Sequence, residues 1–349
     1  MKRTLSVLLA LCLLMSCALF AGCSNNGNSD NFPVTVGEVT IDKEPVSVVV
    51  LSDKLADIIS YIGYDIKMVG RSEECDQDFL KVVPTVGKAS APDVNAITAA
   101  GADLVIADGY LTADARQSIE SAGVKVLVLN PATNKEELEA LYTDLGTALG
   151  GKTAGAEKGK KGYNTLFDTL ETLNTVSTGV VQTAAYLYIN EAGQLCTFPA
   201  GSLEQTFFNY SGTSNVFISQ TEPVVQAEYL RIESPTYLFV DSPDVLQVLQ
   251  ADPSLAGINA LVNGHTLVIP KINFERHGSS VEQAVFDILS YIEKISKGTP
   301  DEATAAATET ATDAATEAAT DAAAAEATEE ATASAEDAAA LAAADGGTY

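Results

Sequence analysis

The sequence has few of the residues that nucleic-acid binding and metal coordination require. Of its 349 residues, two are histidine, none is tryptophan, and 20 lysines and arginines stand against 47 aspartates and glutamates. The net charge of −27 repels nucleic acid and offers no basic patch to anionic lipid, so neither is expected as a partner. His265 and His277 are too few to form the converging ligand sets that hold bare zinc or manganese. A site for a naked metal ion is therefore not expected.

Cysteine is also scarce, and three of the five cysteines lie within the first 23 positions. The apolar run Leu5–Phe20 follows two basic residues; it has the length of an export signal and is shorter than the ~20 residues of a spanning helix. Cys23 follows this run and precedes the stretch SNNGNSDN, which is typical of a flexible tether. Cys75 and Cys196 remain, and their separation favours no bridge, so both are expected to be free thiols.

The composition changes at the C-terminal end, where residues 299–349 are rich in Ala, Thr, Glu and Asp. The repeat TETATDAATEAATDAA places acidic residues at i,i+4 spacing, which destabilises a helix, and no apolar stripe is present for packing. This tail is predicted to be disordered and without a specific role. A hydrated cell-surface segment with glycosylated threonines is the alternative.

Between these ends, short β-branched runs alternate with segments of helical spacing. Strands are expected at residues 46–51, 66–70, 102–107, 124–129, 184–189, 236–240 and 265–270. This alternation is typical of βαβ units on largely parallel sheets. The predicted fold class is α/β, with two lobes that have mainly parallel sheets, one long backbone helix that joins them, and a ligand cleft between the lobes.

The predicted organisation has six parts. They are a signal peptide at 1–22, a flexible tether at 23–37, an N-terminal α/β lobe at 38–151, a linking helix at 152–178, a C-terminal α/β lobe at 179–298, and the disordered tail at 299–349.

Four segments point to a family. In chain order they are PTVGKASAPDVNAITAAGADLVIADGY, FPAGSLEQTFFNYSGTSNVF, EPVVQAEYLRIESPTYLFV and DPSLAGINALVNGHTLVIPKINFERHG. Together they resemble the solute-binding lipoproteins of ABC importers for vitamin B12, ferric siderophores and haem, and the resemblance covers Val46–Ile295. Leu255 stands where the family usually has tryptophan. The resemblance implies a binding protein and not an enzyme, and the motifs G-x-S-x-G and H-E-x-x-H are absent from the sequence.

The stretch LFAGC resembles the lipobox of bacterial lipoproteins, in which signal removal leaves a lipid-bearing N-terminal cysteine. This resemblance implies a lipid on Cys23 and an extracytoplasmic protein anchored to the cell membrane. Cys17 in LLMSC is a competing acceptor, and an uncleaved membrane anchor is the alternative.

The resemblance also implies two exposed glutamates, one on each lobe, that dock onto arginines of the permease. The family pattern places the second at Glu228, whereas Asn95 occupies the position of the first. Asp93 or the pair Glu73 and Glu74 is a possible substitute, so the docking of the first lobe departs from the family.

Ligand contacts are expected where strands of both lobes end, because loops at the carboxyl ends of parallel strands carry functional residues. The candidates are Ser52, Glu74, Cys75, Asp108, Tyr110, Asn190, Phe198, Ser202, Arg276 and His277. The two aromatic residues among them either stack on a flat macrocycle or line the sheet edge. Arg276 pairs either with a ligand carboxylate or phosphate, or with Glu275 or Glu282. His277 is either a ligand of haem iron or corrinoid cobalt, or an unliganded loop residue.

These observations lead to one expected function and two alternatives. The chain is expected to be a monomeric binding protein that captures a corrinoid, ferric siderophore or haem, delivers it to an ABC permease, and needs no cofactor of its own. A surface sensor or scavenger that lacks a transporter is the first alternative. A hydrolase without a visible motif is the second.

Overall fold

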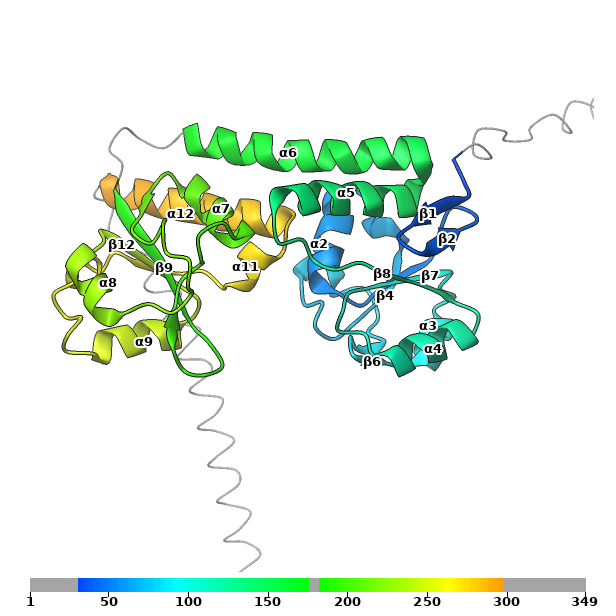
Figure 1. Ribbon diagram of the computed structural model, residues 1–349, viewed down its shortest axis with the longest axis horizontal. Helices are drawn as coiled ribbons and strands as arrows, with labels where there is room; N and C mark the ends of the chain where they lie inside the picture. Colours follow the sequence, from blue (N-terminus) through cyan, green and yellow to red (C-terminus); the bar gives the residue numbers. More distant parts are fainter. Residues whose placement is uncertain (1–30, 176–181, 298–349) are drawn as a thin grey trace, which may run out of the picture. The chain divides into compact units, whose positions relative to one another are not determined.

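The computed structural model describes residues 31–175 and 182–297 (Figure 1). The N-terminal part contains a parallel four-stranded sheet with the order β4-β3-β7-β8. The strands are β3 (Val48–Val50), β4 (Met68–Arg71), β7 (Leu104–Ala107) and β8 (Lys125–Val128). Every residue of β3 and β7 is buried, as expected for central strands of a parallel sheet that is covered on both faces.

Short helices follow these strands, and each of them begins at a side chain that accepts a backbone hydrogen bond. Ser52 precedes α2 (Asp53–Tyr61), Asp93 precedes α3 (Val94–Ala99), and Thr112 precedes α4 (Ala113–Ser121). The smaller elements of this part are η1 (Asp65–Lys67), η2 (Asp78–Leu80) and the paired strands β5 (Gly87–Lys88) and β6 (Ala91–Pro92).

A two-stranded hairpin precedes the sheet. Strand β1 (Val34–Val36) pairs antiparallel with β2 (Val39–Ile41), and Gly37 takes a positive φ of 56° in the turn. Val34, Val36 and Ile41 are buried, so the alternation VTVGEVTI anchors this segment to the folded body. The flexible tether predicted at 23–37 therefore extends too far, because its last residues form a strand.

Two long helices form the backbone of the fold. Helix α5 (Lys135–Gly150) leads through the π-helical segment η3 (Gly151–Gly155) into α6 (Ala156–Thr175), which packs against α5 (Figure 1). A Cβ atom on Gly159 would lie 2.1 Å from the carbonyl oxygen of Tyr142, and one on Gly146 would lie 2.2 Å from that of Gly155. Glycines thus allow the two helix backbones to touch. The linking helix predicted at 152–178 corresponds to η3 and α6, and its last three positions lie outside the described residues.

The C-terminal part repeats the α/β pattern. Its sheet has the order β10-β9-β12-β13, with β11 also paired to β9. The strands are β9 (Thr183–Ile189), β10 (Leu195–Cys196), β11 (Ser214–Asn215), β12 (Tyr237–Val240) and β13 (Thr266–Val268), and only β10 runs antiparallel to its neighbour. The helices are α7 (Leu203–Phe208), η4 (Asn209–Ser211), α8 (Ala227–Glu233), α9 (Pro243–Ala251), α10 (Asn259–Asn263), α11 (Ile272–Glu275) and α12 (Ser279–Ser296).

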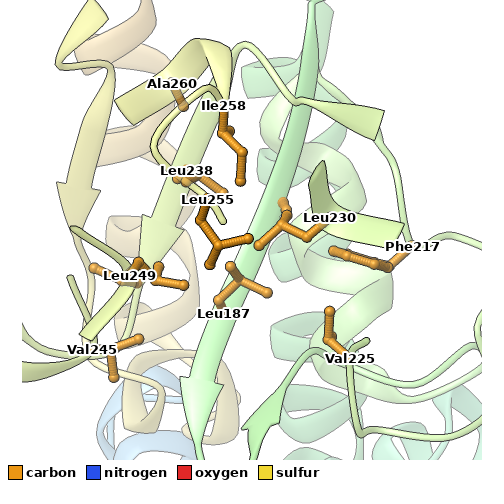
Figure 2. Packing of buried hydrophobic residues seen from close by; sticks show 12 residues of the cluster. Leu187, Phe217, Val225, Leu230, Leu238, Val245, Leu249, Leu255, Ile258 and Ala260 are labelled. Atoms are coloured by element: carbon orange, nitrogen blue, oxygen red, sulfur yellow. The ribbon is translucent and has the colours of Figure 1, made fainter. Parts of the chain in front are cut away.

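One face of this second sheet packs on a continuous apolar cluster. Figure 2 shows Leu187 of β9 and Leu238 of β12 facing side chains from α8, α9 and the segment before α10. Leu255, at the position where the family usually has tryptophan, is only 2% exposed and belongs to this cluster. The leucine side chain, although smaller than that of tryptophan, is therefore part of the packed core.

The predicted α/β class and the parallel sheets are confirmed. None of the helices in the described ranges is long and apolar enough to span a membrane.

Candidate functional site

A pocket of about 300 Å³ lies at the carboxyl ends of the first sheet's strands. Its walls contain Leu51 and Ala89 together with the polar residues Ser52, Asp53, Glu74, Ser90, Asp108 and Tyr110. Ser52 follows β3, Glu74 follows β4, and Asp108 follows β7 directly. The pocket thus lies where functional residues are expected, because loops at the carboxyl ends of parallel strands carry them.

Four of the ten predicted ligand contacts meet in this pocket, namely Ser52, Glu74, Asp108 and Tyr110. The Asp108 carboxylate is held by the backbone, because its Oδ1 accepts a hydrogen bond from Tyr110 N at 2.9 Å. Tyr110 itself is 72% exposed, so its ring is accessible beside the pocket. That these four residues bind a ligand stays a prediction.

Backbone amides hold Glu74 in its charged form. Its Oε2 accepts a hydrogen bond from Ala89 N at 2.9 Å. Desolvation by burial acts to raise the pKa of Glu74, but hydrogen bonds from the backbone amides of Glu74 and Ala89, a hydrogen bond from Ser72 and the charge of Lys88 together outweigh it and lower the pKa. The pocket wall therefore carries a negative charge at neutral pH.

Asp53 connects the pocket to the C-terminal part of the chain. Its Oδ2 accepts a hydrogen bond from Arg276 Nε at 3.0 Å, and Arg276 also forms an ion pair with Asp76. Burial raises the pKa of Asp53, and the Arg276 guanidinium opposes this rise. Arg276 is 7% exposed and its partners are two aspartates, so the alternative of a surface ion pair with Glu275 or Glu282 is wrong.

A second group of ion pairs involves Lys54 and Glu275, which are the sequence neighbours of Asp53 and Arg276. Lys54 Nζ lies 3.0 Å from Glu275 Oε2, and Lys271 also pairs with Glu275. Desolvation opposes the ionisation of Glu275, but its hydrogen bonds with Lys271 and Lys54 and their charges lower its pKa. Arg276 and Lys54, the two cations that act on Asp53, thus each already have a carboxylate partner.

Cys75 and Phe198, both predicted as ligand contacts, are core residues instead. Cys75 is fully buried, its Sγ lies 3.4 Å from Ser72 Oγ, and burial raises its pKa to about 11. Phe198 is 1% exposed and stacks on Tyr186 with ring centroids 4.4 Å apart. These contacts correct the two predictions, and for Phe198 the alternative of a sheet lining is the right one. Cys75 and Cys196 are both free, as expected.

The remaining predicted contacts have structural roles. His277 is 3% exposed, packs on Phe207, and keeps a low pKa of about 3 because burial disfavours its charged form. It is neutral and does not line the pocket, which argues against the predicted ligand contact and agrees with the alternative of an unliganded loop residue. Asn190 accepts hydrogen bonds from Ala192 N and Gln194 N in a turn, and Ser202 caps α7. No group of three or more His, Cys, Asp or Glu within residues 31–175 and 182–297 is arranged to hold a metal ion.

A buried polar junction between α2 and the start of α12 escaped the sequence analysis. Asp57 is fully buried, and its carboxylate accepts hydrogen bonds from Ser280 N at 3.3 Å, Ser280 Oγ at 2.9 Å and Ser279 Oγ at 3.4 Å. Tyr61 donates to Glu282 one turn further along each helix. The sequence contained one sign of this junction, namely an aspartate on the apolar face of a predicted helix. A carboxylate buried there requires a hydrogen-bond partner.

The Asp57→Asn variant is expected to change how stability depends on pH. Burial raises the pKa of Asp57 above its usual value of 3.8, although hydrogen bonds from Ser280 and Gly278 act against this. The folded protein therefore keeps a proton that the unfolded chain has already lost. Relative to the variant, the wild-type free energy of unfolding should fall as the pH rises above about 4. Urea unfolding of both proteins between pH 4 and pH 7 measures this difference. A wild-type advantage that grows with pH would contradict it.

The candidate docking residues are exposed on both parts of the chain. Glu228 lies in the first turn of α8 with 77% of its side chain exposed and an ion pair to Arg231 at 3.4 Å. Asn95 is exposed in α3, and Asp93 caps that helix by accepting from Asn95 N and Ala96 N. The carboxylate of Asp93 is thus already used, but it remains at the surface.

Comparisons with known proteins give a consistent result. A family model described as periplasmic binding protein matches residues 48–272. YvrC of Bacillus subtilis, named as an uncharacterized ABC transporter substrate-binding lipoprotein, is 28% identical over 184 residues, which are 47% of this chain and 58% of YvrC. The alignment thus spans less than two thirds of that relative.

Two solved structures share the fold. One is a possible iron-binding, periplasmic solute-binding protein from Staphylococcus epidermidis, with a TM-score of 0.59, 16% identity, and coverage of 72% of this chain and 99% of the other. The other is the periplasmic haem-binding protein HutB of Vibrio cholerae, with a TM-score of 0.59, 16% identity, and coverage of 71% and 98%. At this identity the likeness concerns the fold alone, and it confirms the predicted two-lobed α/β architecture with a long helix.

Proposed function

The chain belongs to the periplasmic binding protein family, and from this we propose that it is the solute-binding component of an ABC importer. The family consists of binding proteins, so the chain is not an enzyme, as predicted. The observation that carries the proposal is the pocket at the carboxyl ends of β3, β4 and β7, where Ser52, Asp108 and Tyr110 meet inside the matched region. YvrC, named as an ABC transporter substrate-binding lipoprotein, supports the importer.

The proposed cargo is a metal complex, namely a corrinoid, a ferric siderophore or haem. The two structural relatives are named as possibly iron-binding and as haem-binding, which supports this class. The exposed ring of Tyr110 beside the pocket suits a flat or bulky complex that stacks on an aromatic surface. The metal arrives within the cargo, so the protein needs no resident cofactor.

The proposed location is the outer face of the cell membrane. Residues 1–30, which include the signal peptide and Cys23, and the tail from 298 onward lie outside the described residues. The lipobox-like LFAGC and the lipoprotein name of YvrC support a lipid on Cys23. A monomer held by this lipid would present its cargo to the permease in the same membrane.

Docking to the permease should depend on Glu228. The Glu228→Ala variant is expected to lower uptake of the cargo about tenfold or more while its affinity for the cargo stays unchanged, because a docking ion pair is lost outside the pocket. Uptake by cells and equilibrium titration of the purified variant measure the two quantities. Glu191→Ala, which removes an exposed glutamate from a turn, is the matched control.

The second candidate function is that of a surface sensor or scavenger of the same fold without a transporter. The exposed amide of Asn95 favours it, because the family pattern has a glutamate at this position. Uptake of the cargo that stays the same when the whole protein is deleted, together with normal cargo binding by the purified protein, would contradict the importer and favour this candidate.

A further inference from the structure

The pocket has an uneven charge. Three of its lining residues, Asp53, Glu74 and Asp108, carry carboxyl groups, and none of the residues that line it is Lys, Arg or His. Haem propionates and carboxylate siderophores are normally bound by cations or by many hydrogen-bond donors. The wall of this pocket contains no cationic side chain.

Lys88, whose charge acts on Glu74, is exposed and does not line the pocket, and the buried ion pairs next to Asp53 do not compensate for the missing cations either. Arg276 is shared between Asp53 and Asp76, and Lys54 and Lys271 share Glu275. A ligand carboxylate that drew Arg276 away from Asp53 would leave this largely buried aspartate without its cation, which costs more than the new pair returns. The pair between Asp53 and Arg276 therefore acts against anionic ligands.

The wall instead offers acceptors. The Asp108 side chain is 3% exposed, and its one described hydrogen bond uses Oδ1. Glu74 accepts from Ala89 N through Oε2, and it is also hydrogen-bonded to its own backbone amide and to Ser72. An ionised carboxylate has about four acceptor positions, so both groups keep acceptor capacity at the pocket. A ligand that fills this site displaces the water that hydrates these carboxylates. It therefore has to supply N–H donors that replace the lost hydrogen bonds.

We propose that the pocket selects a metal complex that is neutral or cationic and bears amide or ammonium donors, and that it discriminates against complexes with free carboxylates. Asp108 and Glu74 accept hydrogen bonds from these donors. Asp53, which is paired with Arg276, lines the pocket on the side of the C-terminal part. This inference rests on the proposed function and specifies its substrate class.

Titration of the full-length protein with four complexes tests the inference. Ferrioxamine B carries an ammonium group and cobinamide carries primary amides, whereas haem carries two propionates and ferric citrate carries several carboxylates. At least one of the first two is expected to bind about tenfold more tightly, or better, than either of the last two, because the carboxylates of the pocket wall repel the added negative charge.

Two variants locate the effect in the pocket. Asp108→Asn keeps an oxygen for Tyr110 N but removes the charge, and Glu74→Gln does the same for Ala89 N. Each is expected to weaken the donor-bearing complex about tenfold and to leave haem binding equal or tighter. Asp168→Asn, at an exposed position of α6, makes the same charge change outside the pocket and should alter neither affinity.

The outcomes separate this inference from the proposed function. Tightest binding of haem or ferric citrate, or a preference unchanged in both pocket variants, would overturn the inference and leave the importer proposal standing. Binding of none of the four complexes would contradict the proposed function and the inference with it.

Discussion

Replacing Asp57 with alanine is expected to lower the free energy of unfolding by about 3 kcal/mol. The carboxylate is fully buried and accepts three hydrogen bonds from Ser279 and Ser280 at the start of α12. Without it the hydroxyl groups can turn, but the partly buried amide of Ser280 loses its acceptor and a cavity replaces the buried carboxylate. Removal of a buried charge returns part of this loss, and the estimate includes that gain.

Urea unfolding at pH 7 measures the effect. Asp57→Asn keeps an acceptor of the same shape and should lose less than the alanine variant. Asp168→Ala removes an exposed aspartate from α6 and should stay within about 0.5 kcal/mol of the wild type. An alanine variant as stable as this control would show that the junction between α2 and α12 contributes nothing to the fold.

Gly159→Ala is expected to lower the free energy of unfolding by about 1 to 2 kcal/mol. The added Cβ would lie 2.1 Å from the carbonyl oxygen of Tyr142 in α5, and a backbone atom cannot turn away as a flexible side chain can. Overpacking of this kind costs ~1 to 3 kcal/mol or more, and the higher helix propensity of alanine returns ~1 kcal/mol. The two helices have to move apart to accept the methyl group.

Thermal and urea unfolding of Gly159→Ala, compared with Asn164→Ala, measure this cost. Asn164 is exposed on the same helix, so its replacement tests helix propensity without a clash and should raise stability slightly. A Gly159 variant that gains stability to the same extent would contradict the close approach of α5 and α6.

Much of the fold followed from local patterns in the sequence. The β-branched run at 46–51 predicted β3, and the runs at 184–189 and 236–240 predicted β9 and β12 within one or two residues. The same pattern led to the pocket, because the residues just after such strands share one edge of the sheet. Ser52 and Asp108 were found in this way.

The position of a residue in a loop did not predict how deeply its side chain is buried. Phe198 and His277 lie in loops, as expected, yet both are buried because aromatic rings of other elements pack on them, Tyr186 of β9 on Phe198 and Phe207 of α7 on His277. The partners of Asp57 lie more than two hundred residues away in the sequence. No local pattern reports which side chain a tertiary contact will supply, so the role of Asp57 became visible only in the fold.

Thermal unfolding of the purified protein with cobalamin, cobinamide, haem and ferrioxamine B tests the central claim most directly. A ligand at about 100 times its dissociation constant stabilises the folded state by ~2.7 kcal/mol, which raises the melting temperature of a body this size by several degrees. The account predicts such a rise with at least one complex and its loss in a pocket variant. An unchanged melting temperature with every complex would contradict the proposal that this chain captures a metal complex for an importer.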